Sequence, residues 1–143
     1  MRKIIYTVGT SNRTQDEFVD LLNHYRIAAI MDVRRFPTSK FQWFKKENLA
    51  ELLSRCEIEY IYLGEELGGY RSGGYETYMR CDEFIQGRMK AEEIAKDRIA
   101  SIMCAERLPW RCHRRFIARS LVEQGWRVIH IIDGKRTWED NAK

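Results

Sequence analysis

No apolar run in this 143-residue sequence approaches the roughly 20 residues that a membrane-spanning helix needs. The apolar stretch behind the basic N-terminus has about five residues, whereas a signal-peptide core has roughly 7–15, so we expect a cytoplasmic protein. Two prolines and nine glycines are too few for a fibrous or low-complexity chain. The sequence contains neither an internal repeat nor a linker, and with 44% hydrophobic residues it can form a core, which indicates one domain.

Lysine is also scarce relative to arginine, since 17 of the 25 basic residues are Arg. The planar guanidinium group binds phosphates and carboxylates through paired hydrogen bonds. Two segments, residues 32–46 and 105–119, each carry five basic residues and one acid. The net charge of +4 therefore conceals two basic segments, which form a local anion site if the fold brings them together.

Short apolar runs alternate with stretches of helical periodicity along the chain. Strands are predicted at residues 4–8, 28–33, 59–63, 98–104 and 127–132, with helices between them and the last helix at about 111–124. This alternation is typical of a Rossmann-like, three-layer α/β/α sandwich with a mostly parallel five-stranded sheet. We therefore expect residues 1–143 to form a single α/β domain.

Sheets of this kind bind ligands beyond the carboxyl ends of their strands. Nearly every reactive residue type of the chain occurs at or just after those strand ends, where the sequence has Gly9, Ser11 and Arg13; Asp32 and Arg34; Cys104, Glu106, Arg107, Cys112, His113 and Arg114; and His130. Both basic segments also reach this edge of the sheet. The sequence therefore predicts one shared site that binds an anion.

The segment from Cys104 to Arg115 carries the most specific chemistry. Pro109 suits the start of a helix, which would place Cys112 and His113 in the first helical turn. The positive end of the helix, with nearby arginines, lowers a thiol pKa, and an adjacent imidazole activates a cysteine nucleophile. The same helix end suits a bound anion. Alternatively, both cysteines are small buried residues at a strand–helix junction.

Known cysteine loops do not match this segment. A tyrosine-phosphatase loop needs an Arg after five intervening residues, where this sequence has Trp110 or Ala118. A rhodanese loop closes one position earlier with a basic residue, where Pro109 or Ile117 stands. The chemistry of neither loop can be transferred to this protein.

Two other interpretations of the same residues remain open. Cysteine and histidine are common ligands of zinc and iron, and the candidate ligands here are Cys104, Cys112, His113 and His130. The spacing is not a standard one, however, and adjacent side chains on a helix point in different directions. The second interpretation is a disulfide between Cys104 and Cys112.

Two loops near the strand ends have both a structural and a functional interpretation. Asp32 can accept hydrogen bonds from loop N–H groups while Arg34 pairs with an acid, or Arg34 can bind an anion that Asp32 helps to position. The turn at residues 9–13 can cradle a phosphate, or Ser11, Asn12 or Thr14 can cap the following helix.

Aromatic residues near the same edge are also ambiguous. Those interleaved with the first basic segment can stack on nucleic-acid bases or fold onto the core. Tyr70, Tyr75 and Tyr78 surround a glycine-rich loop and can form a lid over the site.

Six motifs occur in a recognisable order: Thr-Val-Gly-Thr-Ser-Asn-Arg (7–13), Asp-Val-Arg-x-x-Pro (32–37), Leu-Gly-Gly (67–69), Cys-Ala-Glu-Arg (104–107), Cys-His-Arg (112–114) and His-Ile (130–131). In this the chain resembles the family called domain of unknown function 488. The resemblance implies a three-layer α/β fold and no established reaction. It points to Gly9, Asp32, Gly68 and Gly69 as structural support, and to Ser11, Arg13, Arg34, Cys104, Glu106, Cys112, His113 and Arg114 in the site. Thr10 departs from the pattern, because many members carry His there.

We therefore expect a small enzyme that binds a phosphate-bearing substrate, either a nucleotide or a nucleic acid, at this edge. The anion would be held by Ser11, Arg13, Arg34, Arg107 and Arg114. Cys112 or Cys104 would be the nucleophile, and His113 or Glu106 would carry the proton. The alternatives are a non-enzymatic nucleic-acid-binding module and a Cys/His metal protein. The sequence assigns no cofactor and no oligomeric state.

Overall fold

A computed structural model describes residues 3–139, in which six strands form one sheet in the order β3-β2-β4-β1-β5-β6. The strands are β1 (Ile4–Gly9), β2 (Ala29–Asp32), β3 (Glu59–Tyr62), β4 (Ala100–Cys104), β5 (Arg127–Ile131) and β6 (Thr137–Glu139). The first five strands are parallel, as their continuous apolar runs predicted, and β6 is antiparallel to β5. The prediction of a mostly parallel sheet is confirmed.

The strand count differs from the prediction, because β6 was not expected. All three residues of β6 are exposed, so it has no apolar alternation to reveal it. Its signal is the Asp133-Gly134 pair, a dipeptide that favours hairpin turns. The Asp133 carboxylate accepts hydrogen bonds from the backbone N–H groups of Lys135 and Arg136, which fold the chain back against β5.

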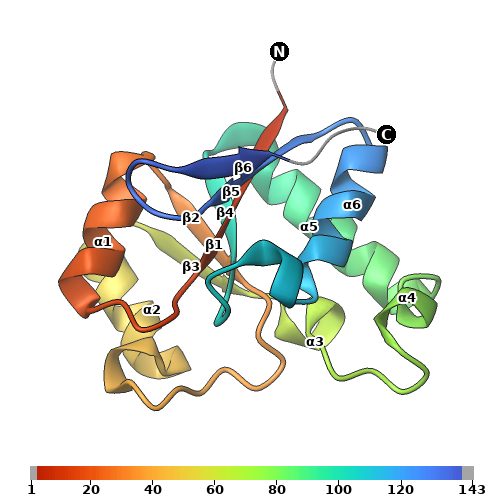
Figure 1. Ribbon diagram of the computed structural model, residues 1–143, viewed down its shortest axis with the longest axis horizontal. Coiled ribbons are helices and arrows are strands. Elements are labelled where there is room, and N and C mark those ends of the chain that lie inside the picture. The colour runs from red at the N-terminus through yellow and green to blue at the C-terminus, as the bar shows by residue number, and fades with distance from the viewer. Residues whose placement is uncertain (1–2, 140–143) are drawn as a thin grey trace.

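Helices cover both faces of the sheet, so the α/β/α architecture is confirmed (Figure 1). The α-helices are α1 (Gln15–His24), α2 (Lys46–Arg55), α3 (Gly64–Leu67), α4 (Tyr75–Tyr78), α5 (Asp82–Asp97) and α6 (Arg114–Glu123), and the 3-10 helices are η1 (Gln42–Phe44) and η2 (Pro109–Arg111). Helices α1 and α2 pack through one buried apolar cluster, and α5 and α6 pack through another on the opposite face. No helix among the described residues has the length and apolar character needed to cross a membrane.

The turn after β1 is used within the fold. Thr14 caps α1, because its hydroxyl accepts a hydrogen bond from the Glu17 backbone N–H and the Glu17 carboxylate accepts one from the Thr14 N–H. The backbone N–H groups of Thr10 and Ser11 donate to the carbonyls of Cys104 and Ala105, each at 2.8 Å. Those two N–H groups therefore bind the neighbouring loop, and the structure favours the capping interpretation of residues 9–13.

The order of the strands creates an opening beside β4. The chain leaves β2 toward α2 on one face and leaves β4 toward α6 on the other. Strands β2 and β4 are hydrogen-bonded neighbours, with Asp32 opposite Met103. Because the two loops part at adjacent carboxyl ends, a crevice forms between them, and this is where parallel sheets bind ligands.

Replacing Gly9 by Ala is expected to destabilise the fold by about 1–3 kcal/mol, the usual range for overpacking. An added Cβ would lie 1.9 Å from the Glu106 carbonyl oxygen, so the loop that carries the site would have to move. Chemical denaturation monitored by tryptophan fluorescence measures the change. Gly134→Ala is the matched control, since its Cβ would meet nothing within 4 Å. Equal stability of the two variants would contradict this prediction, because it would show that the loop moves away from the added Cβ without a cost in free energy.

Candidate functional site

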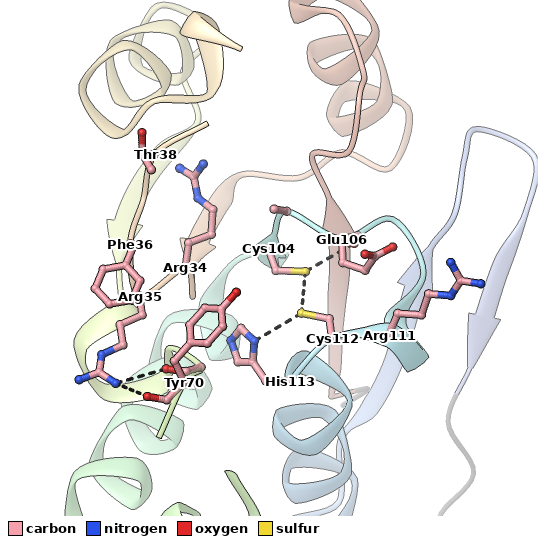
Figure 2. Close-up of a pocket in the computed structure, with 12 residues that line it drawn as sticks. Arg34, Arg35, Phe36, Thr38, Tyr70, Cys104, Glu106, Arg111, Cys112 and His113 are labelled. Carbon is pink, nitrogen blue, oxygen red and sulfur yellow. Dashed lines mark hydrogen bonds between the residues drawn. The ribbon is translucent and has the colours of Figure 1, made fainter. Parts of the chain in front are cut away.

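A cavity of about 600 Å³ opens at the carboxyl ends of β2 and β4. Its walls come from the loop after β2, the glycine-rich loop after α3, and the segment between β4 and α6. The lining residues are Arg34, Arg35, Phe36, Thr38, Gly69, Tyr70, Cys104, Ala105, Glu106, Arg111, Cys112 and His113. Figure 2 shows the two cysteines and His113 gathered on one side, with Arg34, Arg35 and Phe36 on the other. The structure thus brings together residues from four of the six motifs, those at 32–37, 67–69, 104–107 and 112–114.

Cys104, Cys112 and His113 form a continuous chain of contacts. The two sulfur atoms are 3.1 Å apart, and the Cys112 sulfur lies 3.4 Å from His113 Nδ1 (Figure 2). Cys104 ends β4 and is only 1% exposed, whereas Cys112 follows η2 and is half-buried at the cavity wall. Of the two thiols, Cys112 is therefore the one that a ligand can reach.

The backbone around Cys112 differs from the prediction. Helix α6 begins at Arg114, His113 is its N-cap, and Cys112 is extended, with φ −138° and ψ 155°. Pro109 starts the separate short helix η2. The expectation that Cys112 and His113 lie in the first helical turn and point apart is therefore wrong. The extended backbone at Cys112 turns its thiol toward the imidazole.

A carbonyl group sets the orientation of the His113 ring. His113 Nε2 lies 3.1 Å from the Val33 carbonyl oxygen at the end of β2. Because a carbonyl can only accept, Nε2 carries a hydrogen, and in the neutral ring Nδ1 presents its lone pair to Cys112. His113 is thereby positioned to take the proton of the Cys112 thiol.

The surroundings separate the pKa values of the two thiols. A hydrogen bond from the Cys104 thiol, with the hydrogen bond and positive charge of His113, lowers the pKa of Cys112 to about 4. Burial and the same contact with Cys112 raise the pKa of Cys104 well above its ordinary value. The arrangement is therefore a reactive thiolate at Cys112, stabilised by a protonated neighbouring thiol.

Arg114 holds the loop that separates the two cysteines. Its guanidinium is fully buried and donates to the carbonyls of Glu106 and Arg107 and to the Thr7 hydroxyl. Its Nε has no hydrogen-bond partner within the described part of the chain. These bonds join the loop to β1 at the centre of the sheet, so Arg114 fixes the position of the loop between Cys104 and Cys112.

Asp32 and Arg34 form a buried ion pair beside the cavity. The Asp32 carboxylate accepts from Arg34 Nε and Nη2, each at 2.9 Å, and from the Tyr60 hydroxyl. Arg34 Nη1 donates to the Phe44 carbonyl, and the guanidinium points away from the cysteines (Figure 2). The structure favours the structural interpretation of this pair.

Three other predicted anion ligands lie outside the cavity lining. Arg13 is buried and donates to the carbonyls of Gly9 and Ile132. Arg107 forms a 3.9 Å ion pair with Asp133. The Ser11 hydroxyl contacts Asn12, and its backbone has a φ of +50°. With Arg34 and Arg114 also bonded internally, the five predicted ligands mainly stabilise the loops.

The expected glycines lie where backbone segments approach closely. A Cβ on Gly68 would lie 2.7 Å from Arg35 Cα, and one on Gly69 would lie 3.2 Å from His113 Nδ1. Gly69 thus leaves space for the imidazole, and its loop can close against the wall that carries His113.

Arg35, Phe36 and Arg111 were not named as site residues, yet all three line the cavity, together with Tyr70 from the suggested lid. Arg35 Nη1 donates to the carbonyls of Gly69 and Tyr70, which links two walls. Phe36 and Tyr70 are 63% and 86% exposed, with ring centroids 6.1 Å apart. Arg35 and Phe36 could have been identified from their position in the sequence, because they directly follow the end of β2.

Of the three tyrosines suggested as a lid, Tyr70 alone lines the cavity. The hydroxyl of Tyr75 donates to the Leu67 carbonyl, and that of Tyr78 donates to the Glu66 carbonyl. Tyr75 also lies beside the His113 ring, at 5.3 Å between centroids. Tyr75 and Tyr78 are therefore anchored to α3 and support the site.

The four suggested metal ligands do not form one metal-binding group. Residues 3–139 contain no group of three or more His, Cys, Asp and Glu side chains arranged to hold a metal ion. His130 Nδ1 is 2.6 Å from the Thr7 hydroxyl, and its ring stacks on Trp138. All four cysteines are free thiols, so the Cys104–Cys112 pair is a dithiol here.

Comparison with known proteins supports the resemblance given by the motifs. Neither the curated proteins nor the solved structures gave a match. A family model described as domain of unknown function DUF488 matches residues 14–121, which include the 32–37, 67–69, 104–107 and 112–114 motifs but exclude those at 7–13 and 130–131. Since the match covers well over half of the chain, the protein belongs to the family described as domain of unknown function DUF488.

Proposed function

We propose that this protein is a cytoplasmic, cysteine-dependent enzyme that transfers or hydrolyses a group of a phosphate-bearing substrate, a nucleotide or nucleic acid. One observation carries the proposal: the Cys112 sulfur lies 3.4 Å from His113 Nδ1 in the wall of an open cavity. A thiol paired with an oriented imidazole is the arrangement by which cysteine nucleophiles are activated.

Each member of the pair has a defined role in this proposal. His113 Nδ1 takes the thiol proton while Nε2–H stays bonded to the Val33 carbonyl. Cys112 attacks the substrate and holds a covalent intermediate, and the protonated imidazole then supplies a proton to the leaving group. The Glu106 carboxylate lines the same cavity and is the acceptor available to activate water in a hydrolytic second step.

The cavity wall supports the choice of substrate. Its volume of about 600 Å³ falls within the range of small-molecule sites. Arg111 is exposed at this wall, and Arg35 has N–H groups beyond the Nη1 that binds the loop. Exposed Phe36 and Tyr70 rings offer flat apolar surfaces on which a base can stack.

The test offers the purified protein a panel of nucleoside mono-, di- and triphosphates, dinucleotides and short single-stranded oligonucleotides. We expect one class to give a product or a covalent adduct detectable by mass spectrometry. Cys112→Ser should lose this product or adduct completely, and Cys56→Ser should retain it because Cys56 follows α2, outside the cavity lining. Arg111→Ala should weaken binding about tenfold, the effect of removing one charged hydrogen bond. Arg115→Ala is the matched surface control, since Arg115 is exposed but outside the cavity lining.

Each negative result has a distinct meaning. Binding without turnover, with a steep dependence on salt, would contradict the enzyme and favour a nucleic-acid-binding module. Turnover that survives Cys112→Ser would contradict the cysteine mechanism. No binding of the panel at low salt would contradict the phosphate-bearing substrate.

A further inference from the structure

We propose that Cys104 and Cys112 form a redox couple, in which Cys112 reduces a hydroperoxide and Cys104 resolves the product as a reversible disulfide. This activity goes beyond the proposed function, although it uses the same nucleophile. It rests on the placement of two thiols, one reachable and one buried, side by side at the end of β4.

The distance between the sulfur atoms suits this reaction. At 3.1 Å, the Cys104 and Cys112 sulfurs are within the roughly 3–3.5 Å that reacting atoms occupy before attack. A disulfide bond of about 2.05 Å requires them to approach by about 1 Å. Because the connecting loop already brings the two residues into contact, the fold need not open for the bond to form.

The burial of the two thiols divides their roles. Cys112 is half-buried in the wall of an open cavity, so a small oxidant can reach it. Cys104 is 1% exposed, so it meets the oxidant only through Cys112. Arg114 holds the intervening loop through the carbonyls of Glu106 and Arg107, which keeps the second sulfur in place for resolution.

The first step oxidises Cys112. Its thiolate attacks the terminal peroxide oxygen, the O–O bond breaks, and an alkoxide leaves, or a hydroxide where the oxidant is hydrogen peroxide. The leaving group takes the proton that His113 Nδ1, 3.4 Å from the sulfur, has received from the Cys112 thiol, and the imidazole becomes neutral again. Cys112 loses two electrons and becomes a sulfenic acid, while the peroxide is reduced to an alcohol or water.

The second step resolves that intermediate. The Cys104 sulfur attacks the Cys112 sulfur, the S–O bond breaks, and the hydroxide leaves with the Cys104 proton as water. The resulting disulfide is reduced by two molecules of a small thiol, which become its disulfide and restore both cysteines. Formation of the bond also spares Cys112 from irreversible oxidation.

The experiment treats the reduced full-length protein with one equivalent of hydrogen peroxide and counts free thiols after denaturation. We expect wild type to lose two of its four thiols, with the Cys104 and Cys112 peptides joined by a bond that dithiothreitol cleaves. In Cys104→Ser and Cys104→Ala, a dimedone adduct should accumulate on Cys112 instead. In Cys112→Ser, the thiol of Cys104 and the two other thiols should all stay free at the same dose. The Cys56→Ser/Cys81→Ser variant is the matched control and should lose both remaining thiols.

Oxidation of Cys112→Ser as rapid as that of wild type, or a disulfide that joins other cysteines, would overturn the redox proposal. Two alternative serine and alanine variants at Cys104 guard against a folding defect, which circular dichroism detects. The proposal can fail separately from the proposed function: product formation on the nucleotide panel with no disulfide would refute only the redox couple. A disulfide in the absence of any nucleotide-dependent product or adduct would refute only the nucleotide enzyme.

Discussion

Labelling of Cys112 with iodoacetamide is expected to proceed at nearly the same rate from about pH 6 to pH 8, whereas a free thiol with a pKa near 8.5 labels roughly 80-fold faster at the upper end. The reason is that the pKa of Cys112 is lowered to about 4, so the thiolate is fully present above that value and is lost only as the pH falls through it. The shape of the profile is more informative than the absolute rate, because a thiolate of low pKa is also a weaker nucleophile. Peptide mass spectrometry after timed quenching measures the rate at each cysteine.

His113→Ala should restore a rate that rises with pH, since it removes both the hydrogen bond and the positive charge beside the thiolate. His24→Ala is the matched control, because His24 is exposed on α1 and should leave the flat profile unchanged. Cys112→Ser should eliminate this pH-independent labelling. A wild-type rate at Cys112 that climbs with pH like that of a free thiol would disprove the thiolate.

Replacing Asp32 by Ala is expected to destabilise the protein by about 3–5 kcal/mol, the usual effect of leaving one member of a buried ion pair without its partner. Asp32 is fully buried, and its carboxylate accepts from the Arg34 guanidinium, the Arg34 backbone N–H and the Tyr60 hydroxyl. Guanidinium chloride denaturation measures the free energy of unfolding. Removing the carboxylate leaves the Arg34 cation buried, with only 5% of its side chain exposed.

Glu59→Gln supplies the matched control, because Glu59 pairs with Arg98 at the surface and 55% of its side chain is exposed. The loss there should be at most about 1 kcal/mol. The double variant Asp32→Leu/Arg34→Met should be more stable than Asp32→Ala, since it removes the unpaired cation as well. If Asp32→Ala costs no more than Glu59→Gln, the buried pair does not brace the loop after β2.

The main elements of the fold could be predicted from local patterns. The first five strands read as apolar runs because both faces of a parallel sheet are buried, and α1 read as apolar residues at helical spacing after a capping threonine. Strand β6 could not be found this way, because an exposed edge strand of three residues has no apolar pattern. The start of α6 was placed too early, since helical spacing after Pro109 does not reveal that Cys112 is extended.

The site was predicted in part. The sequence indicates which residues lie close together at the edge of the sheet, but it does not indicate which groups each of them binds. Strand ends predicted that Asp32, Cys104 and Cys112 lie at one edge. They could not predict that Arg13 binds the Ile132 carbonyl or that Arg34 binds the Phe44 carbonyl, because those partners lie on other segments of the chain. The same holds for the bonds of Arg114 to the Thr7 hydroxyl and the Glu106 carbonyl. A cluster of arginines in the sequence is compatible with an anion-binding site and equally with arginines that stabilise loops through internal hydrogen bonds. Only the arrangement of the loops decides between the two.

The sequence by itself determined the α/β alternation, the edge of the sheet that carries the reactive side chains, and the family resemblance, since each depends on the order of residues along the chain. The tertiary structure decided which thiol is reachable, which nitrogen of His113 faces it, and which arginines line the cavity. Those properties depend on distances between Val33, Cys104 and His113, which are set by the register of β2 with β4 and by the bonds of Arg114 to the intervening loop. Residues far apart in the chain acquire such distances only when the sheet and its loops have closed around them.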